Sequence, residues 1–344
     1  MKDLLIVGGG FAGICCAQEA SNRNLTYTLV DSGLPNTSSR IAAGIMNPIT
    51  GRKYKPQWGF EELYASAQYI YGGLEKRLGV QIMYPMPIYK IHSSEAALEA
   101  WLISRSQSAI AGMYQEHPPV IPWQKHLDQR FGALLIPMGM RINTQAMTLA
   151  FCQTDDYLPA QFDHQELEIQ QDHVIWRGHS YRHVVFCEGH GVEKNPWFRH
   201  IPMRPNKGEC MIVQIPYLNC PVILQKNVFA VPLGNDRYWI GGTSDNTYTD
   251  DTPTTEKATE LTDDLRRMVR LSFTVENHLA AIRPTMRDRS PAVGTHHTQR
   301  VLHILNGLGT KGSMLAPYYA RQLIAHIFDH TPIPKGADVN RFRP

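Results

Sequence analysis

The sequence has no excess charge of either sign and no long apolar run. Its 344 residues include 34 basic and 31 acidic side chains, which gives a formal net charge of +3. This near balance argues against binding to DNA or to a membrane surface through bulk charge, and it disfavours tRNA as a partner. No stretch approaches the length of an apolar membrane-spanning segment. We therefore expect a soluble, cytoplasmic protein without a membrane span.

Cysteine is also sparse, and no pair has the spacing C-x-x-C. No group of histidines and cysteines has the spacing of zinc ligands, so no metal site is predicted. His296 and His297 are adjacent, and neighbouring side chains of a strand point to opposite faces, so we expect a surface turn there. The small number of cysteines and the absence of paired spacings fit a reducing compartment. The six cysteines are Cys15, Cys16, Cys152, Cys187, Cys210 and Cys220.

What the sequence does contain is a glycine motif near its start. Gly8, Gly10 and Gly13 follow a predicted buried strand at 4–7 and have the spacing G-x-G-x-x-G. The glycines permit a tight turn, close approach to a pyrophosphate, and packing of the next helix on the strand. Asp31 ends a second predicted strand and can bind both ribose hydroxyls, which favours NAD or FAD over NADP. A glycine-rich turn in an ordinary α/β protein is disfavoured, because strand, helix and acid occur in the expected order.

Hydrophobic periodicity and capping residues predict the remaining elements. Helices are expected over 14–20, 60–78, 95–108, 144–151, 254–271 and 317–328. Strands are expected over 27–30, 80–84, 88–91, 134–136, 166–169, 173–176, 183–189, 211–215, 228–232, 238–241 and 301–305. The strands between 208 and 242 are read as antiparallel. A second glycine-rich loop, 306–317, lies between the last strand and the last helix and supplies a second helix N-terminus.

Taken in order, these motifs resemble the D-amino-acid oxidase superfamily of FAD-dependent oxidoreductases. Glycine oxidase, sarcosine oxidase and the oxidase domain of the bacterial tRNA wobble-uridine modification enzyme are the similar members. The resemblance covers nearly the whole chain. Its pieces are Gly8–Gly13 with Asp31, Ser38-Ser39, Ala42-Ala43-Gly44, Val184–Gly189, Arg204-Pro205, Lys207-Gly208, Gly242-Thr243, Ile282-Arg283-Pro284, Asp288–Pro291, Val293-Gly294, Gly307–Gly312 and Ala316-Pro317.

The resemblance implies an α/β fold with two domains. A discontinuous, Rossmann-type FAD-binding domain would comprise residues 1–75, 140–203 and 284–344. A substrate domain built on a mixed, largely antiparallel sheet would comprise 76–139 and 204–283. No cysteine lies near the C-terminal glycine loop and no histidine follows Ser38-Ser39. We therefore expect FAD to be bound without a covalent link.

The resemblance also implies which residues bind FAD. The N-terminal group would lie around the ribose, the pyrophosphate and the flavin, and the C-terminal group would lie at the pyrimidine end of the flavin ring. A helix N-terminus there stabilises negative charge on the reduced flavin. The expected residues are Gly8, Gly10, Phe11, Ala12, Gly13, Asp31, Ser32, Ser38, Ser39, Ala43, Gly44, Ile45, Gly189, Gly307, Leu308, Gly309, Thr310, Lys311, Gly312, Ser313 and Met314.

Three residues are expected to act on the substrate or the flavin. In glycine-oxidase-like members, an arginine at the position of Arg283 pairs with the substrate carboxylate, a task that suits a planar guanidinium. The alternative is an arginine that bridges the domains. Asn47 is expected to face the flavin, and Lys311 either adds positive charge there or points to solvent.

The resemblance implies oxidation of the C–N bond of an amino acid or secondary amine, a small-molecule substrate. A hydride would pass from the α-carbon to flavin N5, the imine would hydrolyse to an oxo acid, and oxygen or another acceptor would take the electrons. Three alternatives stay open: a 2-hydroxy-acid dehydrogenase, a tRNA-modifying oxidase and a flavin-binding protein without turnover. The first needs a histidine facing the flavin, for which His190 and His296 are poorly placed.

Overall fold

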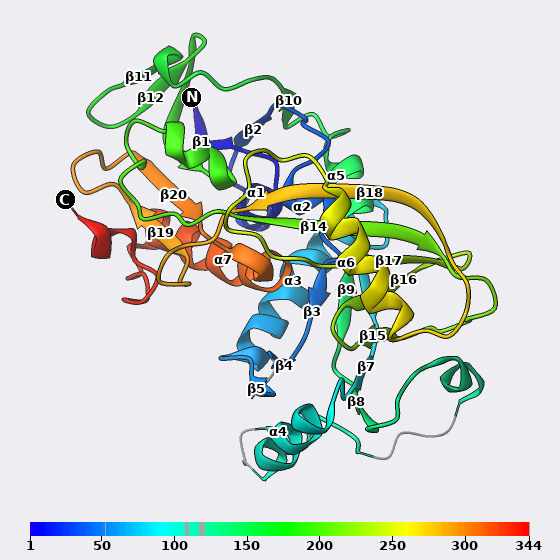
Figure 1. The fold of residues 1–344 in the computed structure, drawn as a ribbon. Helices are drawn as coiled ribbons and strands as arrows, with labels where there is room; N and C mark the ends of the chain where they lie inside the picture. The colour runs from blue at the N-terminus through cyan, green and yellow to red at the C-terminus, as the bar shows by residue number, and fades with distance from the viewer. Residues whose placement is uncertain (52, 107–109, 117–120, 344) are drawn as a thin grey trace.

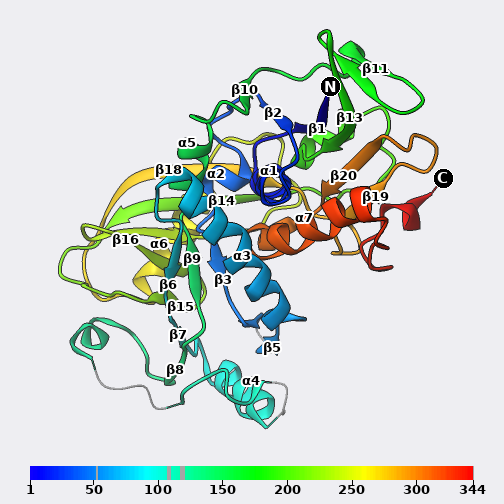
Figure 2. The ribbon, with the colours of Figure 1, turned by 180° about the vertical axis from the view of Figure 1, so that it is seen from behind.

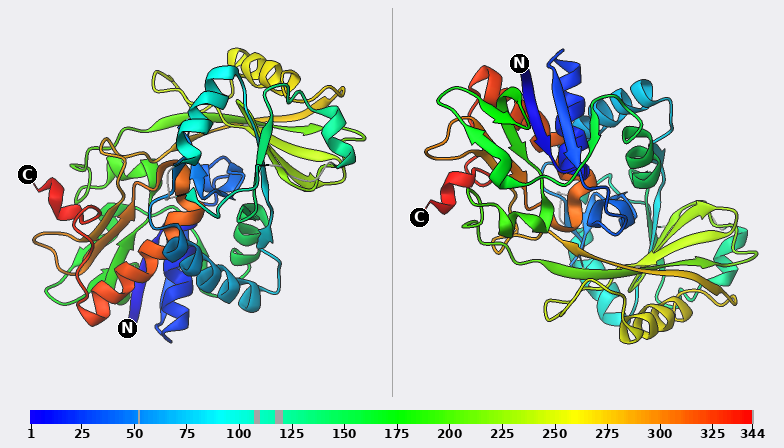
Figure 3. Two further views of the ribbon diagram at one scale, coloured as in Figure 1. Left: turned by 90° about the horizontal axis from the view of Figure 1, so that it is seen from below. Right: turned by 90° about the horizontal axis from the view of Figure 1, so that it is seen from above.

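Two large sheets organise the molecule. The computed structural model describes residues 1–51, 53–106, 110–116 and 121–343, and among these residues one sheet has eight strands and the other seven. Figure 3 separates the two sheets: β1 at the N-terminus belongs to one, and the helix α6 (Thr255–Arg266) lies on the outer side of the other. No helix in this part of the chain is both long enough and apolar enough to span a membrane.

The eight-stranded sheet is built around the first glycine motif. β1 pairs in parallel with β2 on one side and β13 on the other, and β20 is parallel to β13. The antiparallel strand β12 and β20 share the remaining edge of β13. The strands are β1 (Lys2–Val7), β2 (Tyr27–Asp31), β10 (Tyr157–Pro159), β11 (Leu167–Ile169), β12 (Val174–Trp176), β13 (His179–Phe186), β19 (Ala292–Thr295) and β20 (Leu302–Asn306).

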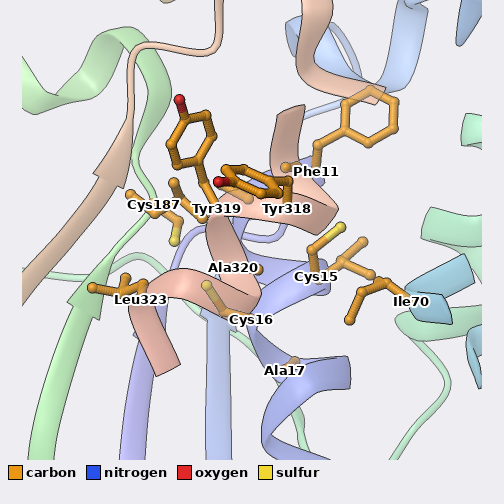
Figure 4. Close-up of a cluster of buried hydrophobic side chains, with 14 of the residues drawn as sticks. Phe11, Cys15, Cys16, Ala17, Ile70, Cys187, Tyr318, Tyr319, Ala320 and Leu323 are labelled. Carbon is orange, nitrogen blue, oxygen red and sulfur yellow. The ribbon is translucent and has the colours of Figure 1, made fainter. Parts of the chain in front are cut away.

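Helices from both ends of the chain cover this sheet. α1 (Phe11–Asn22) and α7 (Gly312–Asp329) pack against each other and against α3 (Phe60–Leu78). Small side chains meet between α1 and α7, among them Cys16, Ala17 and Ala320, and all three are fully buried (Figure 4). Close approach of these two helices places both of their N-termini at the same edge of the sheet. Two further helices, α2 (Ser38–Ile41) and α5 (Thr144–Phe151), lie beside them.

The seven-stranded sheet has the order β18-β14-β17-β16-β15-β7-β8. Its neighbouring strands are antiparallel except for the parallel pair β15 and β7. One face packs on α6 through a core that includes Leu261 and Leu265. The strands are β7 (Ile88–Ile91), β8 (Ala133–Ile136), β14 (Asn206–Gln214), β15 (Ile223–Gln225), β16 (Phe229–Gly234), β17 (Arg237–Gly241) and β18 (Thr274–Arg283).

Two small sheets complete the fold. β3 (Ile45–Met46), β9 (Met140–Ile142) and β6 (Met83–Pro85) form one, and the hairpin of β4 (Ile49–Thr50) and β5 (Lys55–Pro56) forms the other. In two opposite views, α4 (Glu95–Arg105) lies at the end of the molecule away from β11 (Figures 1 and 2).

The fold class predicted from the sequence is confirmed, with an α/β domain of Rossmann type beside a mixed, largely antiparallel sheet. The helix 60–78 and the strand 88–91 have the predicted bounds. The division into domains stays a proposal, supported by the way the two large sheets divide the chain.

The predicted start of the last helix, Pro317, is wrong. Proline usually occurs in a first turn, because it has no N–H to bond the carbonyl four residues earlier. Here α7 begins at Gly312 and continues through Pro317. The carbonyl of Ser313, which Pro317 cannot serve, accepts a hydrogen bond from the buried Tyr71 hydroxyl at 2.7 Å. A tertiary contact therefore replaces the missing helical bond.

Other bounds also differ from the sequence pattern. β6 begins at Met83 rather than at residue 80, and α6 ends at Arg266 rather than at 271. α4 ends at Arg105, while residues 107 and 108 of that prediction lie outside the described residues. The ten-residue strand β18 was not predicted, because its first four residues are polar or exposed and lack clear alternation.

Candidate active site

A cavity of about 1910 Å³ lies against both large sheets. Its wall combines residues from the loop after β1, the segment 37–45, the end of β18 and the loop before α7. These segments are far apart in sequence, and each reaches the cavity at the end of a strand or the start of a helix. Ligands of open α/β sheets bind at this kind of edge, outside the carboxyl ends of parallel strands.

The first glycine motif forms one end of the cavity. Gly8 has φ +105°, and a Cβ there would collide with the carbonyl of Cys187 on the neighbouring segment. The N–H of Gly9 donates to Asp31 Oδ2 at 2.7 Å, which joins the loop to the end of β2. A Cβ on Gly10 would lie 2.8 Å from the hydroxyl of Ser39. The main chain of Gly8, Gly9 and Gly10 therefore lines this end of the cavity without side chains.

A second segment closes around this loop. Ser39, in the short helix α2, accepts a hydrogen bond from the N–H of Phe11 at 3.1 Å. Gly44 has φ +73°, and its carbonyl accepts from the N–H of Ile142 at 2.9 Å. Hydroxyls and backbone groups of this segment therefore line the cavity beside the N-terminus of α1. Asp31, Ser32, Ser38, Ala43 and Ile45 also line it.

The loop before α7 forms the opposite wall. Asn306 joins it to the middle of the chain: its amide donates to the carbonyl of Gly189 at 2.8 Å and accepts from the N–H of Gly307 at 2.7 Å. The first turn of α7 then points its N-terminus at the cavity. The predicted residues that line this wall are Gly189, Leu308, Gly309, Thr310, Lys311, Gly312, Ser313 and Met314.

Two of the predicted cofactor residues do not line the cavity. A Cβ on Gly13 would collide with the carbonyl oxygen of Gly8, which matches the packing role of the third glycine in the motif. Gly307 has φ +77°, and a Cβ there would collide with the side chain of Met286. Both glycines shape the loops that line the cavity.

Arg283 is held at the end of β18. Its Nη1 donates to Asn206 Oδ1 at 2.8 Å and to the Thr243 carbonyl at 2.9 Å. The guanidinium lies directly on Gly208, where any Cβ would collide with it. Among the described residues both hydrogen bonds use Nη1, and no carboxylate pairs with the group. Burial lowers the pKa of Arg283. The other donors of the guanidinium are left for a ligand in the cavity.

Lys311 and Asn47 are the other two residues expected to act on the substrate or the flavin. Lys311 Nζ donates to Gln57 Oε1 at 2.6 Å, so the ammonium is held by a neutral amide, and burial lowers its pKa. Asn47 is 7% exposed, and its Oδ1 accepts from the N–H of Ile49 at 2.9 Å. Both residues line the cavity. The prediction that left Lys311 free to point to solvent missed its contact with Gln57.

Several cavity residues were not predicted from the sequence. Trp239 donates its indole N–H to the Ile41 carbonyl at 2.9 Å and so connects the second sheet to the last residue of α2. Lys90 and Tyr54 also line the cavity. Only Gly208 offered a sequence signal, because glycine within a strand often marks a close approach of another group. The other residues could not be predicted, because the sequence does not show which face of their strand or turn is directed toward the cavity.

The remaining candidates are three histidines, of which His296 and His297 do not line the cavity. His190 lines the cavity, and burial lowers its pKa. His296 and His297 lie in the turn after β19, with ring centroids 4.4 Å apart. Among the described residues no group of three or more His, Cys, Asp or Glu side chains is placed to hold a metal.

The residues present fit FAD. Gly8, Gly9 and Gly10 line the cavity with backbone, and a Cβ at Gly9 or Gly10 would collide with Asp31 or Ser39, so this loop offers main-chain N–H groups where a pyrophosphate would approach. Two helix N-termini, those of α1 and α7, supply backbone N–H groups to a long cavity. Asp31 stands at the end of β2, where an adenosine ribose would be held.

Comparison with known proteins agrees with this geometry. The chain resembles glycine oxidase from Bacillus cereus, with a TM-score of 0.79, 20% identity and 96% of each chain covered. It also resembles iminodiacetate oxidase from Chelativorans sp., with a TM-score of 0.79 and 17% identity over 99% of this chain and 98% of that one. At these identities the likeness establishes the fold.

A curated relative extends the comparison. The bifunctional protein ThiO/ThiG of Trichormus variabilis is 22% identical over 97% of this chain, which corresponds to 54% of the relative. The chain thus spans about half the length of the curated relatives it matches. The model of the DAO family, described as FAD dependent oxidoreductase, matches residues 3–326. The chain therefore belongs to the DAO family and is an FAD-dependent oxidoreductase.

Proposed function

We propose that this protein oxidises the C–N bond of an amino acid or secondary amine that carries a carboxylate. The observation that supports this most strongly is the Arg283 guanidinium, fixed through Nη1 and free of any carboxylate partner among the described residues. A planar guanidinium with free donors binds a carboxylate through two parallel hydrogen bonds. FAD, when bound, accepts a hydride at flavin N5.

The protein residues would orient the substrate and hold the cofactor. Arg283 would fix the carboxylate and so orient the α-carbon for oxidation, in a cavity that Ala43, Gly44 and Ile45 also line. Asn47 would face the flavin, and the start of α7 with Lys311 would stabilise negative charge at its pyrimidine end. Positioning of this kind supplies a large part of the rate in such reactions. We assign no general base, because an amine that binds in its neutral form needs none.

The test is an anaerobic titration of the FAD-loaded protein with amino acids, N-methyl amino acids and hydroxy acids. Loss of the visible flavin absorbance with amines is expected. For the variant R283M, the two lost charge-assisted bonds should lower kcat/KM by about 10²- to 10⁴-fold. The control is R287M, because Arg287 is an exposed arginine that follows the same strand and does not line the cavity. Loss of absorbance with hydroxy acids alone would contradict the proposal.

A further inference from the structure

The seven-stranded sheet turns one continuous row of side chains toward the cavity. Across neighbouring strands, Cys210 lies opposite Gly241, which lies opposite Phe229, followed by Gln225 and Lys90. Residues directly opposite each other in a sheet share a face. Arg283 belongs to the same face, because it is four residues after Leu279, the partner of Cys210.

Lys90 stands at the far end of this row. β7 is separated from β18 by five strand-to-strand steps, each of about 4.8 Å. Its side chain is buried, with 6% exposed, and it lines the same cavity as Arg283. The two positive groups therefore lie at opposite ends of this row, and both line the same cavity.

The ammonium of Lys90 has no charged partner among the described residues. Nζ donates to the Gly51 carbonyl at 3.2 Å and lies 4.2 Å from the centre of the Tyr54 ring. Both contacts come from the turn between β4 and β5, and they leave donors of the ammonium unused. Burial lowers the pKa of Lys90 to about 8. An unpaired buried ammonium is costly, and an anionic ligand would offset that cost.

Lys226, the residue directly after the neighbouring strand β15, shows the contrast. Its side chain also borders the cavity, but its Nζ donates to the Asp128 carbonyl at 2.8 Å, to the Asp128 carboxylate at 3.2 Å and to the Arg267 carbonyl at 2.7 Å. All three donors are used. Lys226 is therefore committed to the fold, whereas Lys90 is available to a ligand.

Ser93 and Ser94, which follow β7, also line the cavity, as do the carboxylates of Glu260 and Asp264. The cavity of about 1910 Å³ is also about twice the upper limit of roughly 1,000 Å³ for a common ligand site. It has room for FAD together with a substrate that reaches well beyond Arg283.

We infer that Lys90 forms a second anion-binding subsite, which selects amines or amino acids that carry a distal carboxylate or phosphate in addition to the carboxylate at Arg283. The inference rests on the proposed function and deepens it by giving a class of substrate. The distal group would accept hydrogen bonds from Nζ, while Tyr54 and Gly51 keep the ammonium in place.

The test measures binding rather than turnover. A homologous series of α,ω-dicarboxylates is titrated into the FAD-loaded protein, together with ω-phosphono carboxylates and monocarboxylates of equal length, and Kd is followed by perturbation of the flavin spectrum. Beyond a threshold length, ligands with two anionic groups should bind about 10- to 100-fold more tightly than the matched monocarboxylates. The two dianionic series distinguish a carboxylate from a phosphate subsite.

Variants then assign the effect to one lysine. K90Q should remove the advantage of the second anionic group, K90R should retain most of it, and K226Q should retain all of it. R283M should weaken binding of every carboxylate in the series, which separates failure of the proposed function from failure of the subsite. Equal affinities for mono- and dianionic ligands of all lengths, no binding of either, or equal effects of K90Q and K226Q would each overturn the inference.

Discussion

At the scale of single residues, the orientation of Arg283 depends on its neighbours. Asn206 accepts from Nη1 through Oδ1. Its two Nδ2 hydrogens have three acceptors within hydrogen-bond distance: Ser244 Oγ at 3.0 Å, the Asp245 carbonyl at 3.0 Å and Asn246 Oδ1 at 2.9 Å. The amide therefore couples the guanidinium to the loop after β17. Asn206 is a positioning residue, because it reaches the substrate only through Arg283.

Removing this amide should loosen the substrate carboxylate without stopping the reaction. We expect N206A to raise KM by about 3- to 10-fold, with a smaller change in kcat, because one hydrogen bond that holds Arg283 is lost. Steady-state kinetics with the best amine of the panel measures both constants. N277A, at an exposed position of β18, is the control. A fall in kcat of about 3- to 10-fold with an unchanged KM would contradict a positioning role.

Lys90 makes a second prediction at this scale, on stability. Burial lowers its pKa from the ordinary value of 10.5, which applies to the unfolded chain, to about 8 in the folded protein. Between these pH values the unfolded chain binds more protons than the folded one, so the free energy of unfolding rises with pH. Relative to K90Q, the wild type should gain up to about 3 kcal/mol between pH 8 and 10.5. Urea unfolding at pH 7.5 and pH 10 measures the difference, and a constant difference would contradict the assigned burial.

At the scale of elements, the entry of α7 into the site depends on a contact with α3. The helix runs through Pro317, and the hydroxyl of Tyr71 supplies the hydrogen bond that the Ser313 carbonyl lacks. The first turn of α7 is also the part that lines the cavity. A side chain of one helix thus stabilises the cofactor-facing end of another.

The variant Y71F should therefore be destabilised by about 1–3 kcal/mol, the cost of a buried carbonyl without a partner. Urea unfolding gives the free energy, and flavin content after purification shows whether the start of α7 is disturbed. Y69F is the matched control, because Tyr69 lies on the same helix and is 49% exposed. Equal stability of Y71F and Y69F would show that water or another group serves the carbonyl.

At the scale of the whole molecule, FAD would join segments that are distant in sequence. The loop after β1, the segment 37–45 and the loop before α7 meet at the cavity, and Asn306 connects the last of them to Gly189. A ligand that binds only the folded state stabilises it, by about 2.7 kcal/mol at a concentration of 100 Kd. Removal of FAD should lower the unfolding midpoint by a matching amount, measured by Trp fluorescence in urea at several FAD concentrations. A midpoint independent of FAD would contradict this assembly.

The sequence predicted those parts of this assembly whose reasons are local. The strand, glycines and helix around Gly8–Gly13 follow from spacing, and the helix 60–78 follows from its apolar period. Arg283 was found through a family resemblance. Lys90 was not found, because the four residues of β7 are all buried and their pattern does not show which face meets a cavity. Pairing of β7 with β15, and Tyr71 with α7, depends on contacts between distant segments.

The most direct measurement is the visible absorption spectrum of the purified, FAD-loaded protein during anaerobic addition of amino acids and N-methyl amino acids. We expect flavin absorbance to be lost with an amine that carries a carboxylate, R283M to require far higher concentrations of it, and R287M to behave as the wild type. Failure of every amine to reduce the flavin, together with reduction by hydroxy acids, would contradict the proposed oxidation of a C–N bond.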